Sequence, residues 1–123
     1  MARLLGFSGS GRTGSFNTKL LEAAAVQARE AGFEVELVSL KGLDLPIYDG
    51  DLEAAEGLPE HAKRFKRLLI EHDGFLIASP EYNGSLTAVL KNAIDGATRP
   101  EPDEPRLAAF VGQHAALMAA SPG

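Results

Sequence analysis

Hydrophobic positions follow two different periods along this chain, and the two alternate. Short apolar runs bounded by polar or glycine-rich residues predict buried strands, over residues 2–8, 33–40, 74–79 and 114–120. Apolar residues spaced three or four apart predict amphipathic helices between these strands, over residues 15–31, 59–71 and 85–97. Strands that alternate with helices predict an α/β fold, with a parallel sheet that carries helices on both faces.

Glycine, proline and serine mark the expected element ends. Gly32 suits the left-handed end of the first helix, Pro59 suits the first turn of the second, and Ser85 is a plausible N-cap for the third. Residues 41–57 are expected to form one long loop. Residues 99–105 contain three prolines and are expected to form another.

The chain reaches Gly123 directly after the fourth predicted strand. A doubly wound sheet normally continues with at least one more helix and strand. We therefore expect a C-terminally incomplete domain, either a natural truncation or a fragment. In such a domain the fourth strand is an unprotected apolar edge that invites pairing with another chain.

Length and composition narrow the possible functions. The 123 residues suffice for one domain with a hydrophobic core, so we expect a single domain over residues 1–123. The chain has no cysteine, which excludes disulfides and thiolate sites, and its formal charge of −5 disfavours a nucleic-acid partner. The first apolar run is too short to span a membrane. The basic run over residues 63–67 is expected to be the solvated face of a helix.

Small polar residues crowd the segment between the first predicted strand and helix, which reads Gly9-Ser10-Gly11-Arg12-Thr13-Gly14-Ser15-Phe16-Asn17. It matches a dinucleotide fingerprint, but the acid that would hold a ribose is missing near Ser39 and Leu40. It also matches the glycine spacing of a triphosphate P-loop, in which a lysine would replace Ser15. Several hydroxyls, Arg12 and a helix N-terminus remain, and together they suit a phosphomonoester. The alternative is a turn whose serines and glycines serve only geometry and capping.

A second polar loop, Ser79-Pro80-Glu81-Tyr82-Asn83-Gly84-Ser85, follows the third predicted strand. Pro80 makes the exit from the strand rigid, and Asn83-Gly84 favours positive φ. Polar backbone beside an aromatic suits a planar heterocycle, although a β-turn followed by an N-cap accounts for the same residues. Both loops are expected at the carboxyl edge of the sheet, where such sheets bind ligands. A phosphorylated planar cofactor is the simplest ligand that fits both.

The histidines give no metal site. His61 and His72 lie on one predicted helix, but about 16 Å of helix separates them, and His114 stands alone. We expect all three to be structural or solvent-facing. Glu81 is the one carboxylate of the second loop and is not assigned as a general base. We therefore predict no catalytic side chain and no metal ligand.

These motifs resemble the NADPH-dependent FMN reductases of flavodoxin-like fold, a family that includes quinone, chromate and azo-dye reductases. The resemblance covers essentially the whole chain. It rests on residues 9–17, on residues 80–85, on Leu90-Lys91-Asn92-Ala93-Ile94-Asp95, and on residues 119–123 as the start of the family's third flavin loop. It implies a doubly wound sheet in strand order 2-1-3-4, with the fifth strand missing. Gly96 departs from the family, which usually has tryptophan there, in a region that looks like part of the subunit interface.

The resemblance also implies FMN as cofactor and NAD(P)H as co-substrate. The FMN phosphate would be held by Ser10, Arg12, Ser15 and Asn17. The isoalloxazine ring would lie along Pro80, Glu81, Tyr82, Asn83 and Gly84, with Ser121 approaching from the next loop.

We accordingly expect a cytoplasmic oxidoreductase that passes hydride from NAD(P)H through the flavin to quinones or similar small acceptors. The resemblance implies a homodimer or homotetramer, without a nucleic-acid or membrane partner. Two alternatives stay open at this point. One is a flavodoxin-type electron carrier, and the other is a non-catalytic truncated remnant that oligomerises through its open edge.

Overall fold

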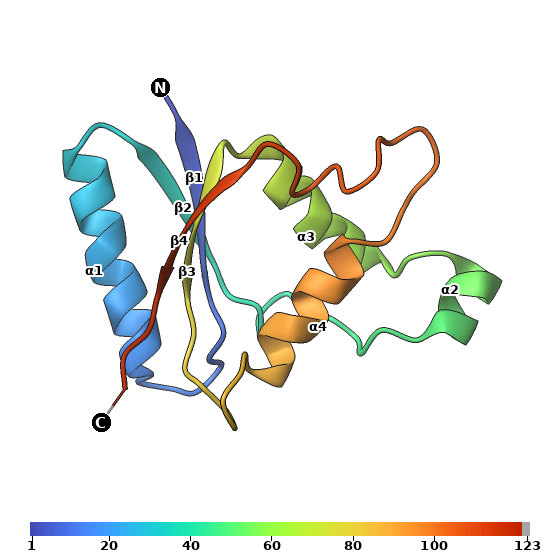
Figure 1. Ribbon diagram of the computed structural model, residues 1–123, viewed down its shortest axis with the longest axis horizontal. Helices are drawn as coiled ribbons and strands as arrows, with labels where there is room; N and C mark the ends of the chain where they lie inside the picture. The colour runs from blue at the N-terminus through green and yellow to red at the C-terminus, as the bar shows by residue number, and fades with distance from the viewer. Residues whose placement is uncertain (122–123) are drawn as a thin grey trace.

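A parallel sheet forms the centre of the molecule (Figure 1). The computed structural model describes residues 1–121 of the chain. Its strands are β1 (Arg3–Ser8), β2 (Glu34–Val38), β3 (Gly74–Ala78) and β4 (His114–Met118). They pair in the order β2-β1-β3-β4, and all three pairs are parallel, which confirms the predicted strand order. The loops that follow the strands therefore emerge at one edge.

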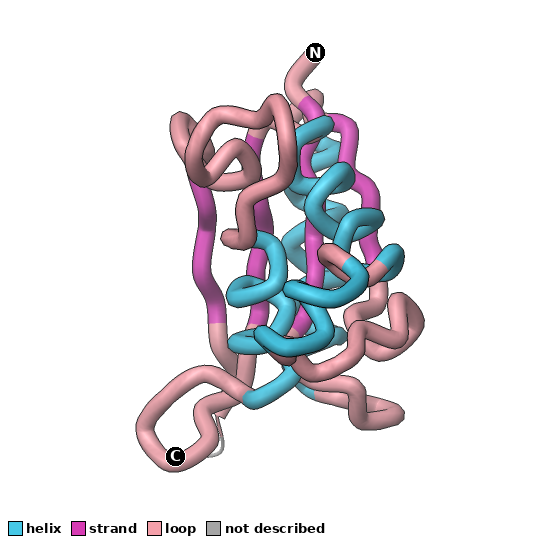
Figure 2. Tube along the Cα trace, turned by 90° about the vertical axis from the view of Figure 1, so that its right-hand side faces the viewer, coloured by secondary structure: helices cyan, strands magenta, loops and turns pink. Residues whose placement is uncertain are grey.

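Helices cover both faces of the sheet, as predicted. They are α1 (Phe16–Glu30), α2 (Gly50–Glu56), α3 (Glu60–Glu71) and α4 (Ala88–Ala97). The helix α1 covers one face, and α3 and α4 cover the other (Figure 1). Figure 2 shows α3 and α4 in front of the row of strands. No helix within residues 1–121 is long and apolar enough to cross a membrane.

The helix α2 interrupts the segment that was predicted to be one long loop, so that prediction was wrong. The Asp49 side chain caps this helix by accepting hydrogen bonds from the N–H groups of Asp51 (2.9 Å) and Leu52 (3.4 Å). Gly57 ends it at a φ of +81°. Because α2 has seven residues and none of them is buried, it has no apolar stripe that a periodicity could reveal.

The helix α4 begins later than predicted. Its N-cap is Thr87, whose Oγ1 accepts a hydrogen bond from the Leu90 N–H at 3.3 Å, and the predicted cap Ser85 lies outside the helix. Ser85 instead pairs with Tyr82 across a tight turn. The turn thus includes the predicted cap, and the helix begins only at Ala88.

The larger part of the core lies between the sheet and the helices α3 and α4. The rings of Phe7 on β1 and Phe65 on α3 meet edge to face, with centroids 5.3 Å apart. Leu69 and Leu90 are also fully buried there. A smaller cluster joins α1 to the opposite face of β3. Burial on both faces explains why β1 and β3 read as continuous apolar runs.

The basic run on α3 is not wholly solvated, which corrects one prediction. Lys66 is only 3% exposed. Its Nζ donates hydrogen bonds to the Arg99 carbonyl at 2.7 Å and to the Glu104 carboxylate at 2.5 Å. A buried charge requires such partners, and this pair ties residues 99–104 to α3.

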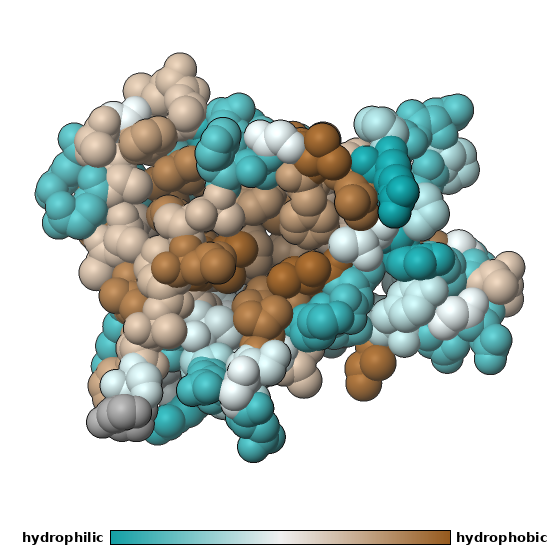
Figure 3. All heavy atoms as spheres, in the orientation of Figure 1, coloured by the Kyte–Doolittle hydropathy of each residue, from teal (hydrophilic) through white to brown (hydrophobic). Residues whose placement is uncertain are grey.

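The strand β4 is an edge of the described sheet, and its side chains lie largely in the open. Leu117 is 77% exposed and Val111, just before the strand, is 69% exposed. Figure 3, in the orientation of Figure 1, shows hydrophobic residues gathered across the middle of the molecular face that it presents. The expectation that the fourth strand presents an apolar edge is confirmed for residues 1–121.

Candidate cofactor-binding site

Three loops meet at the carboxyl edge of the sheet and line a solvent-accessible cavity of about 550 Å³. We call them the first loop (residues 9–15, after β1), the second loop (79–87, after β3) and the third loop (119–121, after β4). The cavity is lined by Ser10, Arg12, Ser15, Phe16, Asn17, Pro80, Tyr82, Ala120 and Ser121. The topology thus brings together residues more than 100 positions apart in the sequence.

Most of the predicted site residues line this cavity. The ones that do are Ser10, Arg12, Ser15, Asn17, Pro80, Tyr82 and Ser121. Glu81, Asn83 and Gly84 belong to the second loop but do not line the cavity. Phe16 was missed, although its place between Ser15 and Asn17 in the motif could have suggested it. Pro122 and Gly123, quoted for the third loop, lie outside the described residues.

Serine hydroxyls hold the turns of the first loop. Ser8 Oγ accepts a hydrogen bond from the Ser10 N–H at 3.1 Å, and Ser10 Oγ accepts one from the Arg12 N–H at 3.4 Å. Ser15 Oγ caps α1 by accepting from the Thr18 N–H at 3.3 Å. The hydroxyls therefore have the capping role that the simpler interpretation gave them, while each hydroxyl proton can still be donated to a ligand.

The first loop also presents unused donors. Within residues 1–121 no acceptor is found for the backbone N–H groups of Gly11, Thr13, Gly14, Phe16 and Asn17. In the same part of the chain, Arg12 forms no ion pair. Backbone donors at a helix N-terminus beside a free guanidinium form an electropositive site that suits an anion.

The first and second loops are packed directly against each other at Gly9. Thr87 Oγ1 donates a hydrogen bond to the Gly9 carbonyl at 2.6 Å, and the Gly9 N–H donates to the Ala78 carbonyl at 2.7 Å. A Cβ on Gly9 would lie 2.4 Å from Ser79 Oγ and 2.9 Å from Ser79 Cβ. Only glycine allows this approach, so Gly9 sets the spacing of the two loops.

The second loop turns through Asn83 and Gly84, whose φ angles are +54° and +80°. Backbone hydrogen bonds between Tyr82 and Ser85, of 3.0 and 3.2 Å, close the turn. Positive φ at both central residues is the pattern of tight hairpin turns and confirms the prediction for Asn83-Gly84. No residue of the described chain accepts from the N–H groups of these two residues, which stay available to a ligand.

Gly84→Val should lower the free energy of unfolding by about 1–3 kcal/mol, because a β-branched residue strongly disfavours positive φ. Gly84→Asn is the matched control and should lower it much less, since asparagine tolerates this region. Chemical denaturation of the three proteins measures the difference. Equal stabilities of the valine and asparagine variants would show that backbone conformation does not limit this position.

The third loop is attached to the start of α1 through Asn17. Its Oδ1 accepts a hydrogen bond from the Ala120 N–H at 2.9 Å, and its Nδ2 donates to the Ala120 carbonyl at 3.3 Å. Asn17 is only 5% exposed. The side chain thus joins the start of α1 to the third loop, and both Asn17 and Ala120 line the cavity.

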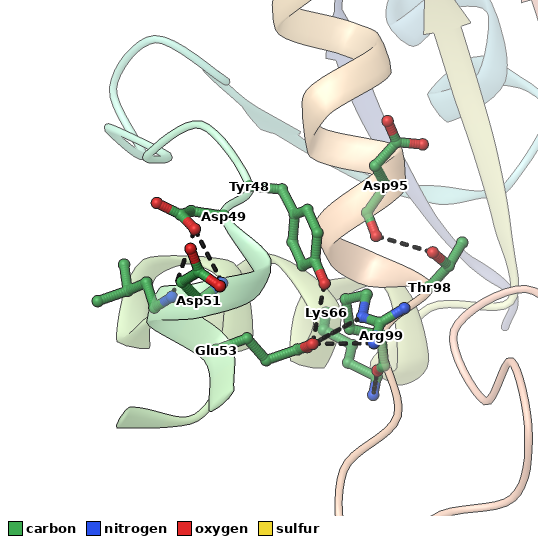
Figure 4. Close-up of polar contacts among 9 residues, drawn as sticks. Tyr48, Asp49, Asp51, Glu53, Lys66, Asp95, Thr98 and Arg99 are labelled. Carbon is green, nitrogen blue, oxygen red and sulfur yellow. Dashed lines mark hydrogen bonds and ion pairs between the residues drawn. The ribbon is translucent and has the colours of Figure 1, made fainter. Parts of the chain in front are cut away.

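A second polar cluster lies away from the cavity, between α2 and the end of α4 (Figure 4). Arg99 donates to both carboxylate oxygens of Glu53, at 2.8 and 2.9 Å, and the Tyr48 hydroxyl donates to Glu53 at 2.9 Å. The Arg99 hydrogen bonds lower the pKa of Glu53, and the hydrogen bond to Glu53 raises the pKa of Tyr48. These groups satisfy one another, so the cluster holds α2 in place rather than forming a reactive site.

Acid should loosen this cluster. The pKa of Glu53 is lower in the folded protein than in the unfolded chain. The stability that the Glu53 carboxylate contributes is therefore fully present at pH values above the unfolded pKa, and it is lost as the pH falls through the folded pKa. Thermal melts between about pH 6 and pH 3 should therefore show a smaller acid loss for Glu53→Gln than for the unmodified protein. Glu56→Gln, on the same helix, is the control and should keep the full loss. Parallel curves for all three proteins would contradict this assignment.

No metal site is found within residues 1–121, where no three metal-binding side chains of the usual types come together. His72 is buried, with Nδ1 2.6 Å from the Leu68 carbonyl and Nε2 3.1 Å from the Glu36 carboxylate. His61 Nδ1 lies 3.0 Å from the Asp44 carbonyl. Both histidines thus have structural partners.

The strand order and a ligand cavity at the carboxyl edge define a flavodoxin-like α/β protein. Residues 2–123 match the family described as NADPH-dependent FMN reductase, and the chain belongs to that family. The resemblance drawn from the loop motifs is thereby confirmed.

Individual relatives agree with this placement. The chain is 41% identical, over 121 residues, to an NAD(P)H-dependent FMN reductase of Pseudomonas aeruginosa, a match that covers 98% of this chain and 60% of the relative. It is 43% identical over 100 residues to an NAD(P)H:quinone oxidoreductase of Solanum tuberosum, covering 80% of this chain and 50% of the relative. The chain thus spans between half and two thirds of the length of these relatives.

A solved structure shows the same fold. The flavoenzyme NAD(P)H:(acceptor) oxidoreductase of Paracoccus denitrificans superposes with a TM-score of 0.82 at 36% sequence identity. The match covers 100% of this chain and 63% of that one. The expected flavodoxin-like fold is therefore confirmed by a related structure as well as by the topology.

Proposed function

We propose that this chain binds FMN in the three-loop cavity and is an oxidoreductase that uses NAD(P)H to reduce quinones or similar small acceptors. One observation carries the proposal: Arg12 and the serines at the start of α1 line the same cavity of about 550 Å³ as Pro80 and Tyr82, so an anion and a planar ring of one ligand could both be held there. A volume of this size falls in the usual range for small-molecule and cofactor sites. When bound, FMN would supply the hydride chemistry, and the protein would bind and orient it.

The first loop would hold the phosphate. Arg12 would pair with its charge, the hydroxyls of Ser10 and Ser15 would donate to its oxygens, and so would the unused N–H groups at the start of α1. Asn17 would contribute through its backbone N–H, which lies in the first helical turn. These groups tolerate a dianion without a metal ion.

The second and third loops would hold the ring. Pro80 and Tyr82 line the cavity. Asn83 and Gly84 lie in the same turn outside the cavity lining, and their N–H groups, which have no acceptor within the described chain, would serve heteroatoms at the ring edge. Glu81 lies beside them in the same loop, and Ser121 lines the cavity from the third loop. No side chain is assigned as general acid or base, since orientation and exclusion of water are the tasks left to the protein.

The exposed aromatic side chains that line the cavity favour an enzyme over a flavodoxin-type electron carrier. Phe16 and Tyr82 line the cavity and remain 69% and 55% exposed. Two accessible aromatic side chains offer contact area to a second flat molecule, such as a nicotinamide or a quinone. The Pseudomonas aeruginosa and Solanum tuberosum relatives, an NAD(P)H-dependent FMN reductase and an NAD(P)H:quinone oxidoreductase, point to the same substrates.

The proposal includes assembly into a homodimer or homotetramer. This part of the proposal rests on the family to which the chain belongs, since the resemblance implies such an assembly. Sedimentation velocity would measure the assembly state directly. A cytoplasmic location belongs to the same proposal, because NAD(P)H is available there.

The activity can be tested with the full chain loaded with FMN. Anaerobic addition of NADPH should bleach the flavin absorption, and addition of a benzoquinone should restore it and sustain NADPH oxidation. Free FMN at the same concentration is the control, and the protein should accelerate the reaction well beyond it. Rates no higher than those of free FMN would contradict the enzymatic proposal.

A further inference from the structure

We propose that Asn17 is a positioning residue, whose carboxamide fixes the third loop against the first and so sets the width of the flavin cavity. The inference rests on the proposed function, since it assumes that FMN occupies this cavity. It gives the side chain of Asn17 a different task from the phosphate contact that the sequence suggested. The phosphate would then be met by the backbone N–H of Asn17.

The geometry of the contact is that of a backbone pair. The Asn17 carboxamide accepts from the Ala120 N–H at 2.9 Å and donates to the Ala120 carbonyl at 3.3 Å. A carboxamide carries an acceptor oxygen and a donor N–H group side by side, which is what the N–H and carbonyl of one residue require. Asparagine therefore pairs with Ala120 much as a neighbouring strand would.

The position of Asn17 allows this pair to fix the third loop relative to α1. It lies in the first turn of α1, two residues after the cap Ser15, so its backbone is fixed by the helix. The strand β4 has already ended at Met118, whose carbonyl accepts from the Ser79 N–H at 3.0 Å. Beyond that point, Asn17 joins the third loop directly to the helix start that carries the free donors. Both partners line the cavity.

A loop-positioning role and a phosphate-binding role for the Asn17 side chain predict different effects on FMN and riboflavin affinity. Riboflavin carries the isoalloxazine ring without the phosphate. A side chain that holds the ring-facing loop should matter equally for FMN and riboflavin, whereas a phosphate ligand should matter for FMN alone. One Nδ2 proton and the Oδ1 acceptor are already engaged with Ala120, which favours the first possibility.

The test uses Asn17→Ala in the full chain, with Thr18→Ala as the control on the same turn. Fluorescence titration should show that Asn17→Ala weakens FMN and riboflavin by the same factor, about tenfold for the loss of two hydrogen bonds. Without any flavin, amide exchange followed by NMR should show a protected Ala120 N–H in the unmodified protein and in Thr18→Ala, and rapid exchange in Asn17→Ala.

If Asn17→Ala does not fold, Asn17→Asp measured with riboflavin replaces it. The carboxylate keeps the acceptor, so Ala120 should stay protected while riboflavin affinity falls.

Each other outcome overturns the proposal. A loss of affinity confined to FMN would make the Asn17 side chain a phosphate ligand. Unchanged affinities at a lower thermal stability would leave Asn17 a purely structural residue. An unprotected Ala120 N–H in the unmodified protein would remove the contact itself. Absence of flavin binding in the unmodified protein and in Thr18→Ala would instead overturn the proposed function, and the exchange data would still stand.

Discussion

Gly9→Ala is expected to abolish flavin binding and to lower the free energy of unfolding by about 1–3 kcal/mol. The added methyl would lie 2.4 Å from Ser79 Oγ, 2.9 Å from Ser79 Cβ and 2.9 Å from Thr87 Oγ1. Because Ser79 Cβ is anchored to the backbone, the clash cannot be relieved by a rotamer change alone. The first and second loops must separate, and the hydrogen bond from Thr87 to the Gly9 carbonyl must lengthen.

Gly11→Ala is the matched control within the same loop. The three nearest neighbours of its added methyl would be Cδ, Cβ and Cγ of the exposed Lys41, at 3.2, 3.3 and 3.7 Å, so no contact is as short as those at Gly9. A flexible side chain can move away, so this variant should lose less than about 1 kcal/mol. Urea denaturation and FMN titration of both variants provide the comparison. Comparable losses for the two variants would show that close packing at Gly9 does not set the loop spacing.

Arg12→Ala is expected to weaken FMN by about tenfold to a hundredfold and to leave riboflavin nearly unchanged. A charge-assisted hydrogen bond contributes roughly 1.5–3 kcal/mol, and riboflavin lacks the phosphate that would accept it. Arg12 lines the cavity and has no ion pair within the described chain, so its charge is free to meet a ligand. Isothermal titration with both flavins would measure the ratio.

Lys19→Ala removes the same amount of charge from the same end of α1 and serves as the control. The Lys19 ammonium lies over the Phe16 ring, 5.5 Å from its centroid, and does not line the cavity. It should therefore change FMN affinity only through long-range charge, by a small factor that vanishes at high salt. If Arg12→Ala affects FMN and riboflavin equally, Arg12 does not contact the phosphate.

The sheet could be predicted from the sequence because its interior strands are buried on both faces. The segments that became β1 and β3 contain few polar residues, and the helices between them have regular apolar stripes. The right-handed rule for parallel connections then restricts the topology. The helix α2 could not be found in this way, since it buries no residue and is held by the contact between Glu53 and Arg99.

The place of the site could also be predicted, because loops that follow parallel strands meet at one edge. The contacts between these loops could not be predicted. The close approach at Gly9 depends on Ser79 and Thr87, and the role of Asn17 depends on Ala120, a residue without chemical features of its own. Lys66 was misjudged for the same reason, because its partners lie more than 30 positions away in the sequence. Long-range contacts of this kind leave no local pattern.

The central claim is that the three-loop cavity holds FMN. The most direct measurement is to mix the purified full chain with excess FMN, pass the mixture through a desalting column and record the absorption spectrum of the protein fraction. The account predicts a flavin spectrum at a stoichiometric ratio to the chain, and a much weaker one when Arg12→Ala is used. A protein fraction free of flavin, with all FMN retained in the salt volume, would contradict it.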